Sequence, residues 1–270
     1  MKKLLTVLFA LLMIFCLAGC SGSNDAATDA ADATVEAANP LDDALLADGK
    51  IIIGTSPDYP PFETLSAAGE LEGFEIDLMK EVVDILNEQN GTNYEIEFKQ
   101  MDFSTIIGAL QASQIDIGLS GFTYSPERDC IFTTPHFGTK QIIVTREDTG
   151  ITCADDLIGK KVAAGEGTTG DMALIEIVDE GNVTYPGDYT VMYQALQAGQ
   201  LDAVVSDEAV GDNYVAEMGL VKCAEALVDE EMSFIIKTGN TVLADAVNKA
   251  VETFMATDGY NALVAKWELQ

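Results

Sequence analysis

Blocks of apolar and polar positions predict two successive α/β units in this chain. Residues 50–55 (KIIIGT) form a short apolar run that ends in a glycine and a turn cluster, the pattern of a buried strand. Apolar residues recur every three or four positions over 74–86, which predicts a helix, whereas residues 94–98 alternate like a strand. A helix over 103–112 and a strand over 115–119 complete the first unit.

The second unit repeats this order. Residues 161–166 (KVAAGE) share the K-x-x-x-G frame of the first strand and predict another strand. We then expect a helix over 167–178, a strand over 189–193, a short helix that ends at Ala198, and a strand over 203–206. Such alternation indicates mostly parallel sheets with flanking helices, and two such units indicate two lobes.

One sequence segment occurs in both units with different endings. Residues 109–122 (ALQASQIDIGLSGF) and 195–208 (ALQAGQLDAVVSDE) each supply a helix end and the third strand of a lobe. In open parallel sheets, ligands bind outside the carboxyl ends of the strands. The repeated parts are therefore expected to be scaffold, and the loops after the strands to face a cleft: 55–62, 120–128, 167–171 and 206–208.

The start of the chain has the pattern of a secretory signal. Lys2, Lys3, an apolar run and small residues before Cys20 indicate a signal peptide over 1–19 that resembles those cleaved before a lipid-modified cysteine. The alternative is a membrane-spanning anchor, but the run over 4–18 is shorter than the roughly 20 residues that such a helix needs. Residues 20–44 are small and acidic, and we expect a flexible tether that holds the protein to a membrane through acyl chains on Cys20.

The chain is strongly acidic. It has 14 basic and 45 acidic residues and a formal net charge of −31. Such a surface repels phosphate backbones, so nucleic acid is a poor partner, and solubility accounts for acids that are scattered along helix faces.

The cysteines and the single histidine indicate no metal or redox chemistry. Cys130, Cys153 and Cys223 remain after the signal and the lipidated cysteine are set aside, and their spacing fits neither zinc nor a CxxC pair. Free buried thiols are expected, and if two of them pair, Cys153 and Cys223 are the better candidates because they share a lobe. His136 is expected to be a packed ring, and no metal or cofactor is expected.

The loop SGFTYSPERD (120–129) carries a candidate anion site. We expect Ser125 and Pro126 to start a helix whose first turn holds Arg128, a rigid fork of donors that fits a carboxylate. Ser120 and Thr123 would supply further donors. The alternative is a surface arginine paired with a neighbouring acid.

The loops of the second lobe complete the set. Thr168 and Thr169 in GEGTTGD stand at a predicted helix start, where free N–H groups favour an anion, although a plain cap is the alternative. Asp207 could bind an ammonium group or cap the next helix, and Tyr59 and Phe103 could hold a ligand side chain or belong to the core. Together these groups are suited to the two charges of a free amino acid.

Several motifs in order resemble one protein family: GTSPDYPPFETL, GELEGFEIDL, MDFSTIIGAL, SGFTYSPERD, GTTG and LDAVVSDE. The chain resembles, over about residues 45–268, the family 3 extracellular solute-binding proteins, the polar amino acid receptors of ABC importers. The resemblance implies a type II periplasmic-binding-protein-like fold, with lobe 1 formed by 45–139 and 237–270 and lobe 2 by 140–236. The lobes would be joined by two hinge strands near residues 140–144 and 233–237. It also implies that an ABC permease receives the ligand. We expect a monomer, held through Cys20 on the outer face of the cell membrane, or located in the periplasm of a Gram-negative cell.

The resemblance also implies roles for individual residues. Arg128 with Thr123 and the second threonine, Thr169, would bind the ligand carboxylate, Gly121 would offer backbone contacts, and Asp207 would bind the ammonium. Tyr59 and Phe103 would flank the ligand side chain. The chain departs from the family pattern at the candidate specificity positions Ser56, Gly165, Glu166 and Ser206.

Two other functions remain open. Some periplasmic dehydratases resemble these receptors, but that chemistry needs a placed acid or base, and Glu63 and Glu166 are the only candidates. A lipoprotein that presents its ligand to a separate sensor is the third possibility. We expect a receptor and no enzyme.

Overall fold

The structure is a computed structural model that describes residues 49–269. The predicted signal peptide, Cys20 and the tether lie outside the described residues. The described chain alternates strands and helices, which confirms the α/β prediction. Its helices are α2 (Phe74–Asn90), α3 (Phe103–Gln111), α4 (Thr169–Ile175), α5 (Tyr189–Gln197), α6 (Glu208–Met218), α7 (Thr241–Met255) and α8 (Asp258–Lys266).

Ten strands form one continuous sheet in the order β10-β9-β11-β8-β13-β6-β1-β5, with β12 attached to β8 and β7 attached to β13. β1 pairs in parallel with β5 and β6, and β9 pairs in parallel with β10 and β11. The strands are β1 (Lys50–Thr55), β5 (Glu95–Gln100), β6 (Ile117–Thr123), β7 (Cys130–Phe132), β8 (Phe137–Thr145), β9 (Val162–Ala163), β10 (Val183–Thr184), β11 (Ala203–Asp207), β12 (Val221–Lys222) and β13 (Val228–Lys237). A small second sheet contains β2 (Asp58–Tyr59), β3 (Glu63–Leu65) and β4 (Leu71–Glu72).

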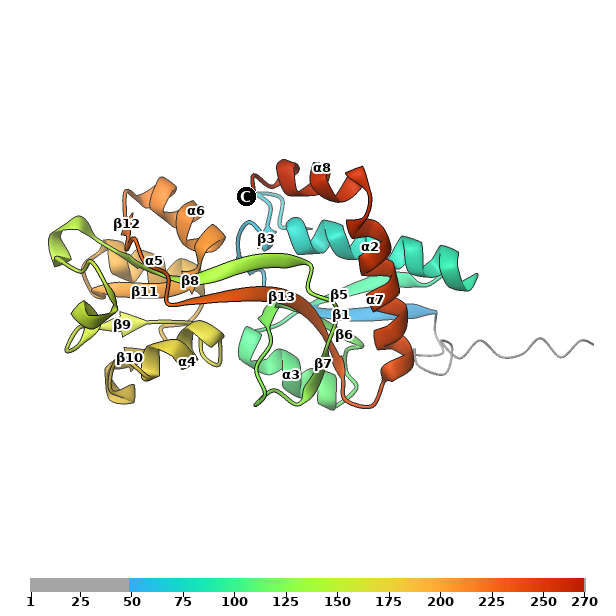
Figure 1. Ribbon diagram of the computed structural model, residues 1–270, viewed down its shortest axis with the longest axis horizontal. Coiled ribbons are helices and arrows are strands. Elements are labelled where there is room, and N and C mark those ends of the chain that lie inside the picture. The colour runs from blue at the N-terminus through green and yellow to red at the C-terminus, as the bar shows by residue number, and fades with distance from the viewer. Residues whose placement is uncertain (1–48, 270) are drawn as a thin grey trace, which may run out of the picture. The chain divides into compact units, whose positions relative to one another are not determined.

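The long strands β8 and β13 connect two halves of this sheet (Figure 1). The end of β8 pairs with β11, its start pairs with the start of β13, and the later residues of β13 pair with β6. We call β1 to β7 and the loops between them, with α2, α3, α7 and α8, the first half, and β9 to β12 with their loops and α4 to α6 the second half. The predicted hinge segments near 140–144 and 233–237 lie in β8 and β13.

Helices cover both faces of the first half because its strands are apolar on both sides. Ile51 and Ile53 pack into a core with α2 and α7, whereas Ile52 between them packs with α3 on the other face. Helix α2 ends at Gly91, whose φ of 66° is the left-handed conformation that glycine adopts without a steric penalty. The segment after β13 returns to the first half, where α7 packs against α2.

One predicted strand is wrong. Residues 189–193 belong to helix α5, which Asp188 caps by accepting a hydrogen bond from Val191 N at 2.8 Å. The apolar residues at 189, 191 and 193 resemble a strand pattern. The buried positions of the full helix, however, are Tyr189, Met192, Tyr193 and Leu196, which follow the helical period.

The helix predicted to start at Ser125 and the bounds predicted for another helix are also wrong. Ser125 and Pro126 start no helix: Arg128 N donates to Ser125 O at 3.2 Å in a turn, and the chain enters β7. The reason is long-range, because β7 pairs with β13 and a helix could not supply that pairing. The helix predicted over 167–178 spans only Thr169–Ile175.

The cysteines match the expectation of free thiols, but Cys130 and Cys153 are only partly buried. Cys130, Cys153 and Cys223 are all free thiols in the structure, with Cys223 buried. The alternative disulfide between Cys153 and Cys223 is therefore not formed here.

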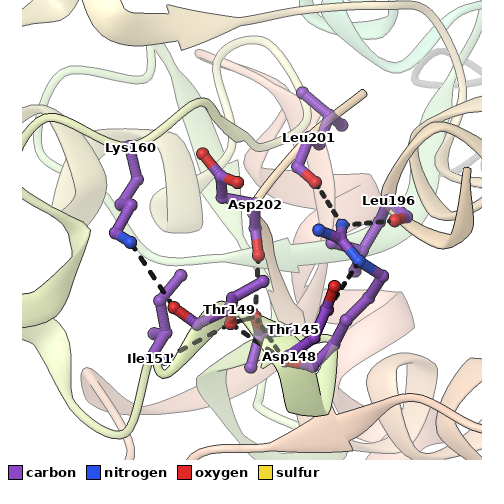
Figure 2. A network of polar contacts seen from close by, with 9 residues as sticks. Thr145, Asp148, Thr149, Ile151, Lys160, Leu196, Leu201 and Asp202 are labelled. Atoms are coloured by element: carbon purple, nitrogen blue, oxygen red, sulfur yellow. Dashed lines mark hydrogen bonds and ion pairs between the residues drawn. The ribbon is translucent and has the colours of Figure 1, made fainter. Parts of the chain in front are cut away.

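A hydrogen-bond network fastens α5 and the following loop to the end of β8 (Figure 2). Arg146 Nη1 donates to Leu196 O at 2.7 Å and to Leu201 O at 2.6 Å. Next to it, Thr145 Oγ1 donates to Asp202 O at 2.7 Å. Because Leu196 lies in the last turn of the helix that Tyr189 begins, this network holds α5 in place against the sheet.

Replacing Arg146 with methionine keeps most of the apolar stem and removes the donors. We expect the free energy of unfolding to fall by about 1–3 kcal/mol, because two backbone carbonyls lose a charged donor. Urea unfolding followed by circular dichroism measures the change. Lys80→Met removes a solvent-exposed cation paired with Asp77 and should cost less than about 0.5 kcal/mol. Equal losses in the two variants would contradict the role given to Arg146.

Candidate functional site

A cavity of about 370 Å³ lies between the two halves, at the carboxyl ends of β1, β5, β6, β9 and β11. This is the location that the strand order predicts for a ligand. All predicted site residues except Thr123 and Ser206 line it. The first half contributes Ser56, Asp58, Tyr59, Asp102, Phe103, Ser104, Ser120, Gly121 and Arg128, and the second half contributes Gly165, Glu166, Thr168, Thr169, Tyr185, Gly187, Asp188, Tyr189, Met192 and Asp207.

Arg128 lies on the first-half wall with its guanidinium fixed from two sides. Nη1 donates to Thr123 O at 2.6 Å and Nη2 donates to Gly167 O at 2.9 Å. The guanidinium carbon lies 5.4 Å from the ring centre of Phe122 and 5.7 Å from that of Phe103. Burial lowers the pKa of Arg128 from its high ordinary value. A guanidinium of this kind has the donor geometry that fits a carboxylate.

Thr123 therefore lies beside Arg128 but supports it through the backbone carbonyl. Its hydroxyl is buried and has no hydrogen-bond partner among residues 49–269. The sequence placed the two residues together without indicating which atom of Thr123 makes the contact.

The hydroxyls of the second-half threonines already have partners. Thr168 Oγ1 accepts from Asp171 N at 3.1 Å and donates to Gly165 O at 2.8 Å, which matches the plain-cap alternative. Thr169 Oγ1 donates to Glu230 Oε2 at 2.8 Å. Glu230, which sequence reasoning missed, thus connects this loop to β13.

Asp207 ends β11 and faces the cavity from the second half. It occupies the N-cap position of α6 but makes no side-chain cap hydrogen bond, so the cap alternative does not hold. Tyr59 Oη donates to its Oδ2, and Oδ1 is buried without a partner in the described part of the chain. Burial, and then the charge of Glu230, raise the pKa of Asp207 to about 7, while Tyr59 opposes the shift. A ligand cation would pair with this carboxylate.

Aromatic rings form the apolar part of the cavity. The rings of Tyr59 and Tyr189 lie 4.8 Å apart, from opposite halves, and Phe103 stacks on Phe122 at 4.7 Å. Phe103 therefore combines the two roles predicted for it, because it packs on the core and lines the cavity. Sequence reasoning missed Tyr189 because its segment was predicted to be a strand.

The four candidate specificity positions differ in their surroundings. A Cβ on Gly165 would come within 2.9 Å of Thr168 Cγ2 and 3.0 Å of Tyr189 Oη, so only glycine fits there without a shift. Glu166 is exposed at the cavity. Ser206 is fully buried and bonds Tyr193 Oη at 2.6 Å, so it supports the wall from behind.

Ser56 acts together with Asp58, a second residue that the sequence did not single out. Ser56 Oγ donates to Asp58 Oδ1 at 2.6 Å, and Tyr189 N donates to Asp58 Oδ2 at 3.1 Å across the two halves. Burial raises the pKa of Asp58, and its partner Ser56 opposes that shift. The cavity therefore has a carboxyl group two residues after Ser56.

Residues 49–269 contain no group of three or more histidine, cysteine or acidic side chains placed to hold a metal ion. Over the same residues, no helix combines the length and the apolar composition needed to cross a bilayer.

Comparisons with known proteins agree on one family. The family model described as bacterial extracellular solute-binding proteins, family 3, matches residues 51–270. The arginine-binding extracellular protein ArtP of Bacillus subtilis is 28% identical over 275 residues, with 99% of this chain and 98% of that protein covered. The ABC transporter glutamine-binding protein GlnH of the same organism is 27% identical over 276 residues, with coverage of 99% and 97%.

A solved structure shares the fold. It is that of the ancestral amino acid-binding protein AncCDT-1, a precursor of cyclohexadienyl dehydratase, and it is 30% identical with a TM-score of 0.74. The match covers 83% of this chain and 98% of that one. The resemblance inferred from the motifs is therefore confirmed at the level of family and fold.

The buried carboxyl of Asp207 should make stability depend on pH. Its pKa is about 7 in the folded protein against an ordinary 3.8, so the folded state binds the proton more tightly. Ionisation then costs stability progressively as the pH rises from about 4 to about 7. Asp207→Asn removes this cost. The difference in free energy of unfolding, ligand-free variant minus ligand-free wild type, should therefore be larger at pH 8 than near pH 4 by on the order of 4 kcal/mol.

Urea unfolding of protein refolded without ligand measures this difference at several pH values. Asp212→Asn is the matched control, because its carboxylate is exposed and pairs with Lys222. The control should show a small difference from the wild type that does not grow with pH. A difference for Asp207→Asn that is independent of pH would contradict the assignment.

Proposed function

The chain belongs to the bacterial extracellular solute-binding proteins, family 3, and we propose that it is a receptor that captures one free polar amino acid for an ABC importer. One observation carries the proposal. A partly buried guanidinium and a buried carboxylate with an unpartnered oxygen face the same cavity from opposite halves of the described chain. This arrangement matches the two charges that every free amino acid carries.

In this proposal Arg128 binds the α-carboxylate and Asp207 binds the α-ammonium. The guanidinium offers a planar fork of donors that a carboxylate can accept from twice. The carboxylate of Asp207 is costly to bury alone, and an ammonium would offset that cost. Gly121, Ser120, Thr168 and Thr169 contribute the remaining polar wall around the ligand carboxylate.

The charges that line the cavity favour some amino acid side chains over others. Arg128 is the single basic residue of the lining, while Asp58, Asp102, Glu166 and Asp188 are acids in addition to Asp207. Like charges inside a cleft repel one another. We therefore expect an uncharged polar or a cationic side chain, held near Tyr59, Phe103 and Tyr189, and we expect aspartate and glutamate to be excluded.

Closure of two lobes is part of the proposal. Lobe 1 would comprise 45–139 and 237–270 and lobe 2 would comprise 140–236, with β8 and β13 as hinges. Three contacts at the cavity join the two parts and so support their closure. Arg128 bonds Gly167 O, Tyr59 bonds Asp207, and Asp58 accepts from Tyr189 N.

The location follows from the start of the sequence. We propose that residues 1–19 are removed, that Cys20 is lipidated, and that residues 20–44 tether a monomeric receptor to the outer face of the membrane, or to a periplasmic membrane surface. From there it would pass its ligand to a separate permease. The family description, which places these proteins outside the cytoplasm, supports this location.

A dehydratase on this fold is the alternative, because one structural neighbour is a dehydratase precursor. That neighbour is itself described as amino acid-binding, and the two relatives above are binding proteins. The acid candidates do not favour the alternative: Glu63 does not line the cavity and Glu166 is exposed. We therefore propose a receptor that leaves its ligand chemically unchanged.

Arg128→Ala should abolish tight binding while the fold remains. Removing one partner of a desolvated charge pair costs about 2–5 kcal/mol, roughly 30- to several thousand-fold in affinity. A thermal-shift screen of the twenty L-amino acids would identify the best ligand, and calorimetry would compare the variant with the wild type. Lys80→Ala, which removes a cation on the exposed surface of α2, should leave affinity unchanged. A loss below fivefold for Arg128→Ala would show that the site is assigned wrongly.

A further inference from the structure

The cavity wall beside Arg128 is formed by an irregular part of β6. Along β6 and β13, Phe122 pairs with Ser233 and Gly118 pairs with Ile235, so the three residues 119–121 stand opposite Phe234 alone. This is a bulge, a feature that leaves backbone groups outside the regular ladder. Ser120 and Gly121 in this bulge both line the cavity.

Gly121 adopts a conformation that other residues rarely take. Its φ is +58°, and a Cβ at this position would lie 3.1 Å from Cε1 of Tyr59. The shape of the bulge therefore decides how close the backbone comes to the ring that flanks the ligand. The interactions that hold this shape lie behind the wall, away from the cavity.

Two buried carboxyl groups hold the bulge from behind. Gly121 N donates to Glu75 Oε2 at 2.8 Å, and Ser120 Oγ donates to Glu63 Oε1 at 3.1 Å. Both glutamates are fully buried, and neither lines the cavity. Ser120 Oγ also accepts from Ser56 N at 3.3 Å, which connects the bulge to the loop after β1.

His136 fixes the orientation of Glu75. Its Nε2 lies 2.7 Å from Glu75 Oε1, and both side chains are completely buried. The imidazole stacks on Phe234 with ring centres 4.3 Å apart, and His136 N donates to Met232 O at 2.9 Å. The histidine is thus a packed ring, as predicted, and it packs on the residue that stands opposite the bulge.

Burial favours the protonated form of one of these groups, Glu63. Burial raises the pKa of Glu63 well above its ordinary value, and the neighbouring Glu75 raises it further. Glu75 Oε2 accepts from the Gly121 amide, while its other oxygen, Oε1, lies 2.7 Å from His136 Nε2.

We propose that Glu75 and His136 are positioning residues of the ligand site, which hold the Ser120–Gly121 bulge in the shape that receives the ligand. The inference rests on the proposed function of the cavity. Glu75 has two possible roles. It can be the acceptor for one backbone amide of the site, or a buried group that only stabilises helix α2. The two roles predict different effects of substitution.

Glu75→Gln and Glu75→Leu form the central comparison. Glutamine keeps an acceptor for Gly121 N, so affinity for the best-binding L-amino acid should stay within about threefold of the wild type. Leucine leaves that amide unpaired, and affinity should fall by roughly 5- to 100-fold. Exchange of the Gly121 amide with deuterium, followed by NMR, should accelerate by a similar factor in the leucine variant but not in the glutamine variant.

His136→Phe and Asp77→Asn complete the set. Phenylalanine keeps a ring against Phe234 but removes the bond to Glu75, so affinity and Gly121 protection should fall in the same direction; this variant decides if Glu75→Leu does not fold. Asp77 lies on the same helix and bonds Lys266 and Trp267 instead, so Asp77→Asn should lower stability without affecting either readout.

The outcomes distinguish the inference from the proposed function. A wild type that binds an amino acid, together with a leucine variant of unchanged affinity and unchanged Gly121 exchange, overturns the positioning role. Equal losses of affinity in Glu75→Leu and Asp77→Asn overturn it as well, because general destabilisation then explains both. If no amino acid binds the wild type, the proposed function fails, and exchange of the Gly121 amide alone decides the inference.

Discussion

The buried carboxylate of Asp207 is the constraint on which the account of this site depends. It is 3% exposed, and one of its oxygens has no partner among residues 49–269. Burying an ionised carboxylate without a counter-ion is unfavourable, so this position is costly unless a cation arrives with the ligand. Arg128 faces the cavity from the opposite half and needs an anionic partner, since its charge is also desolvated. A single zwitterionic ligand would supply both the cation for Asp207 and the anion for Arg128.

The sheet explains how two distant segments come to share one ligand. β8 pairs with β11 of the second half, β13 pairs with β6 of the first half, and β8 and β13 pair with each other. The loops after the parallel strands of each half therefore meet at one cavity. This arrangement explains the sequence segment that is repeated at 109–122 and 195–208. Its common part builds a helix and strand, and its two endings supply the bulge at Gly121 and the carboxylate of Asp207.

Local patterns predicted much of this because the responsible forces are local. The apolar period of α2 and the alternation along β5 are visible in the sequence, and the carboxyl ends of strands identify the loops of the site. The predictions failed where distant pairing decides the local structure. The turn that carries Arg128 is set by the pairing of β7 with β13, and the role of Asp58 depends on Tyr189 across the cavity. Glu75 could not be identified either, because its partners Gly121 and His136 are distant in sequence.

Titration of the wild type and Asp207→Asn with the best amino acid and with its 2-hydroxy analogue tests the central claim most directly. If Asp207 receives the ammonium, the analogue leaves the carboxylate unpaired and should bind the wild type at least about a hundredfold more weakly, or about 2.7 kcal/mol. Asp207→Asn should bind the amino acid more weakly and discriminate less, because an amide carries no charge to be left unpaired. Equal affinity of the wild type for both ligands would contradict the account.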